Sequence, residues 1–240
     1  MKEQISLLTQ LFISIALFTS FISCNPTITG EGPVVEVKKD ADKFTKVDMQ
    51  MEANVMITQG TENTVVIHAQ QNIADAIETT LSGKSLKIYS NKNLEPSEPI
   101  TIDITMNNIE GLEISGSGVM KSSGTIKTSE LDLKVSGSGK IFIDAVCNNL
   151  KADISGSGEM TLKGSTTESD LEISGSGHLY AYDLLTQNTE TEISGSGDAQ
   201  VTTTEQLTTK ISGSGSVTYK GNPAKVNPKI SGSGTVKAAQ

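Results

Sequence analysis

The 240-residue chain contains no arginine and no tryptophan, and all 19 of its basic residues are lysine. Against 28 Asp and Glu residues, this gives a formal net charge of −9. Nucleic-acid-binding proteins need a basic surface and often use the bidentate guanidinium of arginine, so we expect no nucleic-acid partner. Only 4% of the residues are aromatic and 35% are hydrophobic, whereas Ser, Thr and Gly are abundant. This composition favours strands and turns over packed helices.

Cysteine is also scarce, and the first of the two cysteines follows an apolar run. Leu11–Ile22 is too short to span a bilayer but has the length of a signal-peptide core. The small residue and cysteine at Ser23–Cys24 resemble the lipobox of bacterial lipoproteins, in which the cysteine becomes the first mature residue and receives acyl chains. The resemblance implies a signal peptide at 1–23 and lipidation of Cys24. An ordinary cleaved signal peptide is the alternative.

The second cysteine, Cys147, would then have no partner in the chain, so we expect it to be a small buried apolar residue. Residues 24–33 are rich in Gly, Pro and Thr and show no apolar periodicity. This composition predicts a short tether that holds the folded part close to a membrane.

The tetrapeptide Ser-Gly-Ser-Gly occurs seven times, and it recurs every 18 to 21 residues. The opening serines are Ser115, Ser136, Ser155, Ser174, Ser194, Ser212 and Ser231. A linker has no reason to recur at a fixed interval, whereas a period near 19 residues is typical of a solenoid. The residue before each tetrapeptide is Ile or Val, and the fifth residue after each opening serine is apolar. Polar and apolar residues alternate beyond it, as in strands.

The sequence therefore predicts an all-β fold, a right-handed parallel β-helix or β-solenoid with coils of about 19 residues, stacked roughly 4.7–4.9 Å apart. Such a coil must turn sharply about three times, and glycine reaches positive φ without steric cost. We predict that the tetrapeptide glycines are the structural corners: Gly116, Gly118, Gly137, Gly139, Gly156, Gly158, Gly175, Gly177, Gly195, Gly197, Gly213, Gly215, Gly232 and Gly234.

The segment before the repeats, residues 34–110, is β-rich but irregular. Ile73–Leu81 has apolar residues at helical spacing and predicts a short helix. We interpret 34–110 as earlier, less regular coils of the same solenoid that carry a small helical insertion or cap. A separate β-sandwich is the alternative. Residues 111–240 then form the seven repeat coils.

The repeated pattern L-x-I-S-G-S-G resembles the putative autotransporter adhesin family with a head GIN domain. The pattern occurs in Gly111–Gly118, and it is close in Leu131–Gly139, Leu171–Gly177 and, with Ala first, Ala152–Gly158. The resemblance covers about 34–240. It implies an exported, often lipid-anchored β-solenoid of a Gram-negative envelope.

Few residues of the repeats suggest catalysis or binding. His178 and Asp198 each follow a tetrapeptide in adjacent coils, and a His–Asp pair can take part in catalysis. An exposed column of opposite charges is the better interpretation. Tyr180 and Tyr182 share one strand face and form, with His178 and Asp198, a candidate binding surface. His68 has no Cys or His near it in the sequence, so we predict no metal site, no cofactor and no catalytic residue.

These observations favour a non-enzymatic envelope solenoid, adhesin-like or a scaffold, over a carbohydrate-active enzyme of solenoid fold or an envelope sensor or assembly factor. We expect a membrane anchor through the N-terminal lipid, with outer-membrane localisation on the periplasmic side or at the cell surface. Envelope proteins or glycans are the expected ligands. The uncapped solenoid end at Ala238–Gln240 predicts end-to-end homo-oligomers.

Overall fold

Stacked parallel strands make up most of the chain in the computed structural model, which describes residues 26–39 and 41–239. The predicted signal peptide and Cys24 lie outside the described residues. The N-terminal elements are β1 (Thr27–Thr29), β2 (Val34–Lys39), β3 (Lys46–Met49), β4 (Asn54–Gln59), β5 (Thr64–Gln70), α1 (Gln71–Asp75), β6 (Glu78–Ser82), β7 (Ser85–Tyr89), β8 (Asn93–Glu95) and β9 (Thr101–Met106). The repeat coils contain β10 (Gly111–Gly116), β11 (Val119–Lys127), β12 (Glu130–Gly137), β13 (Lys140–Gly156), β14 (Glu159–Gly175), β15 (His178–Gly195), β16 (Asp198–Gly213), β17 (Ser216–Lys220), β18 (Lys225–Gly232) and β19 (Thr235–Ala238).

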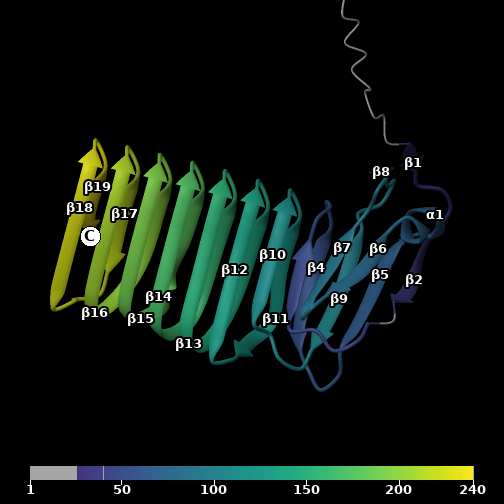
Figure 1. The fold of residues 1–240 in the computed structure, drawn as a ribbon, viewed down its shortest axis with the longest axis horizontal. Coiled ribbons are helices and arrows are strands. Elements are labelled where there is room, and N and C mark those ends of the chain that lie inside the picture. Colours follow the sequence, from purple (N-terminus) through teal and green to yellow (C-terminus); the bar gives the residue numbers. More distant parts are fainter. Residues whose placement is uncertain (1–25, 40, 240) are drawn as a thin grey trace, which may run out of the picture.

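The repeat coils confirm the predicted β-solenoid. Each coil pairs in parallel with the next, and equivalent residues lie over one another: Ser136 pairs with Ser155, Ser155 with Ser174, and Ser174 with Ser194. Figure 1 shows the coils side by side, each with two runs joined at an upper edge where the corner sequences lie. Alternate residues point inward and form a core of Ile, Leu, Val, Met and Ala. A period of about 19 residues therefore places one residue of each coil in every interior column.

Strand structure continues around most of each coil. In β13 to β16 the strand runs from one tetrapeptide to the next and ends after the first glycine, and the pairing register shifts within some coils, as between Ala181 and Leu185. Elsewhere the chain bends while its ladder continues, for example at Gly164, whose φ is +106°. The coils therefore turn at the tetrapeptide and at further bends, where an irregular register bends the strand.

Neither serine of the corner points into the core. None of the fourteen corner serines is buried, and most are exposed. The second glycine of the tetrapeptide is the residue that faces inward, and it is buried in six of the seven coils. The corner therefore turns its backbone to the core and its hydroxyl groups to solvent.

The N-terminal segment joins the same 17-stranded sheet, but out of chain order. β10 and β11 pair with β3 and β4, and β3 and β4 pair on their other side with β7 and β9. The coil of β3 and β4 therefore lies between the coil of β7 and β9, which follows it in the sequence, and the first repeat coil, β10 and β11. Antiparallel strands β2, β5 and β6 pair with one another or with β7 and β9 at this end (Figure 1).

Two local predictions were wrong. The helix predicted at 73–81 is shorter, because α1 ends at Asp75 and Glu78–Ser82 is strand β6. The β-branched pair Thr79–Thr80 pairs with β7, which overrides the helical spacing. The segment predicted as a tether, 24–33, is also partly folded, since β1 pairs with β8 and Asn72 accepts a hydrogen bond from the Glu31 amide.

Candidate functional site

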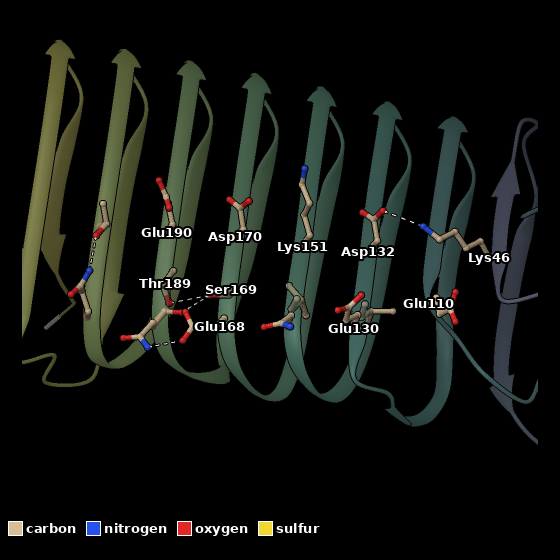
Figure 2. A pocket seen from close by; sticks show the side chains of 16 residues that line it. Lys46, Glu110, Glu130, Asp132, Lys151, Glu168, Ser169, Asp170, Thr189 and Glu190 are labelled. Carbon is tan, nitrogen blue, oxygen red and sulfur yellow. Dashed lines mark hydrogen bonds and ion pairs between the residues drawn. The ribbon is translucent and has the colours of Figure 1, made fainter. Parts of the chain in front are cut away.

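The two runs of each coil present two different outer surfaces. We call the surface on the run that enters each Ser-Gly-Ser-Gly corner the acidic face, and the surface on the run that leaves it the aromatic face. The acidic face contains a groove of about 560 Å³ that crosses the coils from Lys46 on β3 to Thr208 on β16. Figure 2 shows the side chains that line this groove, on neighbouring coils.

Two columns of polar side chains form the walls of the groove. One column is Glu130, Asn149, Glu168, Asn188 and Gln206, and the other is Asp132, Lys151, Asp170, Glu190 and Thr208. Successive members belong to successive coils, so their backbones lie about 4.8 Å apart. The groove therefore offers the same type of group, a carboxylate or a carboxamide, at almost every step.

Charge along the groove is unequal. At one end, the Lys46 ammonium lies 3.7 Å from the Asp132 carboxylate, and it spans an intervening coil because Gly111 there has no side chain. Further along, the Asn188 amide donates to Glu168 at 2.8 Å. Asp170 and Glu190 follow with no ion pair among the described contacts. Like charges in adjacent strands repel, so the Asp170 and Glu190 carboxylates, which lie in adjacent coils, make this part of the groove negative.

The carboxylates of the acidic face raise the pKa values of two neighbouring lysines. The pKa of Lys151 is raised, first by the Asp153 carboxylate and also by Asp170 and Asp132. The pKa of Lys210 is raised by its hydrogen bond to Glu192, 2.7 Å away, and by the more distant Glu190. Both lysines are therefore held in their charged form by the carboxylates of the acidic face.

The floor of the groove changes character in its middle. Leu131 and Leu150 are followed in the same column by Ser169 and Thr189 in the next two coils. Ser169 donates to Thr189 at 3.1 Å, and Thr203 also donates to Thr189, at 2.8 Å. Burying a hydroxyl group is costly unless it is hydrogen-bonded, and this network supplies the hydrogen bonds of Ser169, Thr189 and Thr203.

The second cysteine lies in the core, as the sequence predicts. Cys147 is buried, and its thiol lies 3.5 Å from the Thr166 hydroxyl. Burial raises the pKa of the Cys147 thiol, so the neutral form is favoured. Cys147 therefore fills the core, as a small residue with one weak polar contact.

The predicted binding residues lie on the aromatic face, on the other run of the coils. The rings of His178 and Tyr180 lie 6.3 Å apart, with planes 20° from parallel, and His178 Nδ1 is 3.4 Å from Asp198. These three residues come together as predicted. Tyr182 points the same way, but its ring is covered by the Lys220 ammonium, 4.3 Å from the ring centre.

His178, Asp198 and Ser216 on this face are not arranged as a catalytic triad. Ser216 donates to Asp198 at 2.5 Å, on the side away from His178. A serine nucleophile needs an imidazole that accepts its proton, with the carboxylate behind the imidazole. Here the carboxylate lies between the other two groups, so the column is a hydrogen-bonded ladder of surface side chains.

The other histidine of the chain, His68, also belongs to a surface ion pair. His68 is 3.0 Å from Asp103 on the neighbouring strand. No three His, Cys, Asp or Glu side chains within residues 26–39 and 41–239 are placed to hold one metal ion. Within the same ranges, no helix has both the length and the apolar character needed to cross a membrane.

Sequence reasoning missed the groove. The column two residues before each serine is a ladder of mixed charge, in which Glu113 binds Lys134 and Glu192 binds Lys210. The columns four and six residues before each serine line the groove. Aligning the repeats at these positions shows the carboxylates and carboxamides, but not that they border a depression.

A family model described as "Putative auto-transporter adhesin, head GIN domain" matches residues 43–223. The chain belongs to this family. The match includes the irregular N-terminal coils and most repeats, so the resemblance seen in the L-x-I-S-G-S-G pattern is confirmed. No curated protein matches the chain.

Solved structures share the fold. A structure described as a putative adhesin from Bacteroides fragilis is 24% identical, with a TM-score of 0.83, and covers 88% of this chain and 100% of its own. One described as a putative lipid binding protein from Parabacteroides distasonis is 23% identical (TM-score 0.76; 89% and 100% covered). A putative adhesin from Parabacteroides merdae is 21% identical (TM-score 0.73; 90% and 100% covered). At these identities the likeness concerns the fold.

Proposed function

We propose that this protein is a non-enzymatic, lipid-anchored binding protein of the bacterial envelope, which holds an extended partner in the groove of its acidic face. The observation that supports the proposal is the groove itself, where equivalent polar groups repeat from coil to coil. A regular surface of this kind suits a ligand that is itself extended or repetitive. Membership of an adhesin-type family agrees with a binding role.

The partner is expected to carry positive charge or many hydrogen-bond donors. Glu168, Asp170 and Glu190 lie in the groove, and carboxylates accept hydrogen bonds without donating any. Envelope proteins with lysine-rich segments and glycans with amino groups both meet this description. The site offers no nucleophile–base pair among its described contacts, which supports binding without turnover.

Membrane attachment is proposed to occur through acylation of Cys24, with the protein on the outer membrane. Because β1 begins at Thr27, a lipid on Cys24 would lie within roughly 10 Å of the folded body, three residues at full extension. A metabolic label of palmitate should be incorporated by cells that express the wild-type chain and not by cells that express Cys24→Ser. Equal labelling of the two would reject the anchor.

The binding role is tested by charge reversal in the groove. Asp170→Lys with Glu190→Lys should abolish capture from envelope extracts and from arrays that display amino-sugar glycans and lysine-rich peptides. Glu62→Lys with Glu205→Lys is the matched control, because these two exposed glutamates lie outside the groove. Equal loss in both double variants would mean that net charge, rather than the groove, governs binding.

A further inference from the structure

The few aromatic residues of this protein lie mostly on its surface. The described aromatic residues are Phe44, Tyr89, Phe142, Tyr180, Tyr182 and Tyr219, and only Phe44 is fully buried in the core. The core is filled instead by aliphatic side chains. Exposing apolar rings to water is unfavourable, so three outward rings gathered on one face of a protein with so few aromatics need an explanation other than packing.

The three outward rings share the aromatic face. On β15, Tyr180 and Tyr182 alternate with the buried Ala181, so both side chains point outward. Phe142 belongs to the same column as Tyr180, with Thr161 in the coil between them. Two coil spacings place Phe142 and Tyr180 about 9.6 Å apart along the rod.

Tyr180 is the ring open to a ligand. The Lys121 ammonium lies 5.2 Å from the Phe142 ring centre, and the Lys220 ammonium covers Tyr182. Tyr180 is 38% exposed, has no cation over it among the described contacts, and lies beside the His178 ring. It is the centre of the surface.

Polar groups border this ring on both sides. Thr161 and Gln200 lie next to Tyr180 in the neighbouring coils, and Glu159 and Asp198 lie next to His178 in the same way. An apolar protein or lipid partner would need a contiguous apolar patch, which these neighbours interrupt. A ring flanked by hydrogen-bonding groups fits a ligand that has an apolar face and a polar rim.

A pyranose has this chemistry. Its C–H groups carry partial positive charge and stack on the negative face of an aromatic ring, while its hydroxyl groups project sideways. We propose that the aromatic face is a binding site for a neutral carbohydrate, centred on Tyr180. One sugar stacks on Tyr180, Thr161 and Gln200 bind its hydroxyl groups, and His178 and Phe142 contact the adjoining units. This site is separate from the groove of the acidic face and does not depend on it.

The test is affinity electrophoresis of the folded chain through gels that contain laminarin, xylan, dextran or mannan. At least one of these neutral polysaccharides should retard the wild-type protein. Tyr180→Ala should weaken the association at least tenfold, whereas Tyr180→Phe, which keeps the ring, should retain most of it. Tyr89→Ala is the matched control, because Tyr89 lies on β7 of the N-terminal segment and outside this face.

Circular dichroism of each variant checks that the fold is intact, which is expected because Tyr180 points away from the core. The proposal is overturned if none of the four polysaccharides retards the wild type, or if Tyr180→Ala migrates like the wild type. It is also overturned if Asp170→Lys with Glu190→Lys abolishes retardation and Tyr180→Ala does not, because the groove would then be the carbohydrate site.

Discussion

At the scale of single residues, the two glycines of each corner are required for different reasons. The first adopts positive φ, between +118° and +143° in the seven coils, where a side chain is strained. In every coil except that of Gly116, a side chain on it would also collide with the backbone of the preceding coil. A Cβ on Gly156, for example, would lie 2.7 Å from the Gly137 carbonyl oxygen. The second glycine has ordinary φ but faces the core, and a Cβ on Gly158 would overlap the Val135 side chain.

We therefore expect Gly158→Ala to destabilise the fold by about 2 kcal/mol or more, because the added methyl overpacks a closed interior. Gly124→Ala is the control, since a Cβ there would meet no atom within 4 Å and the residue is exposed. That variant should change stability by less than about 0.5 kcal/mol. The free energies of unfolding come from urea titrations. If the corner were a flexible linker, Gly158→Ala and Gly124→Ala would have equal free energies of unfolding.

Glu110 gives a pH-dependent contribution to stability. It lies where the chain returns from β9 to β10, and its pKa is lowered from 4.5 chiefly by the Thr45 hydrogen bond, with further help from Lys84. A lowered folded-state pKa stabilises the protein above the ordinary pKa, and this stabilisation is lost as the pH falls through the lowered pKa.

Glu110→Gln should therefore cost about 1 kcal/mol at neutral pH, the scale of one partly exposed charged hydrogen bond. The difference from the wild type should shrink below about pH 4.5 and disappear in stronger acid. Unfolding titrations between pH 3 and pH 7 measure this, with the exposed Glu62→Gln as the control. A difference that stays constant over this range would contradict the assignment.

At the scale of elements, the sequence of β18 affects how well its outer edge can pair with another strand. Asp132 donates its backbone amide to Glu110 of the preceding coil, so the next residue turns its backbone towards the following coil. Pro228 occupies that next position in β18, after Asn227, the equivalent of Asp132. Proline lacks an amide hydrogen, so β18 lacks a donor at this point of its outward edge.

Pro228→Leu should restore this donor and increase self-association at the end of the solenoid. The wild-type edge also carries the exposed Lys225 and Lys229, which repel a like edge. Sedimentation velocity over a range of concentrations measures the effect, with Pro223→Leu, outside β18, as the control. If Pro228→Leu sediments like the wild type at all concentrations, Pro228 has no part in protecting the edge.

The order of the N-terminal strands could not be predicted from the sequence. β3, β4, β7 and β9 have the alternation of solenoid strands, but alternation does not say which strand lies next to which. The chain returns past β3 and β4 because β10 and β11 find their pairing partners there. The antiparallel strands β5 and β6 then occupy the outer side of this end. These choices depend on pairing across long sequence separations.

At the scale of the whole molecule, each coil contacts mainly its two neighbours. Removal of one complete coil, residues 159–177, would place His178 on the partner that Glu159 now has, Lys140. The corner, core and strand registers would all be kept. We expect this deletion to fold with the same circular dichroism per residue and a lower unfolding midpoint.

A deletion of half a coil, residues 159–168, is the matched comparison. It would put corner residues over strand residues and move the interior columns out of register, so we expect it not to fold cooperatively. Thermal unfolding followed by circular dichroism distinguishes the two deletions. If both unfold alike, the register between coils does not determine the fold.

The sequence by itself determined the repeating architecture. A period of about 19 residues, a β-branched residue before each corner and glycine within it leave few folds other than a stack of parallel coils, because each requirement is local and is repeated seven times. The same repetition brought His178, Tyr180 and Asp198 together, as predicted.

Only the tertiary structure decided the shape and the cover of the surfaces. The groove is formed by residues of several coils together. Tyr182 is covered by Lys220, which lies two coils further along the stack, whereas Tyr180 is exposed. The corner serines likewise turned outward because the second glycine needs the space inside. A sequence records which residue types recur, whereas depth, cover and orientation come from residues far apart in the chain that meet only after the coils have stacked.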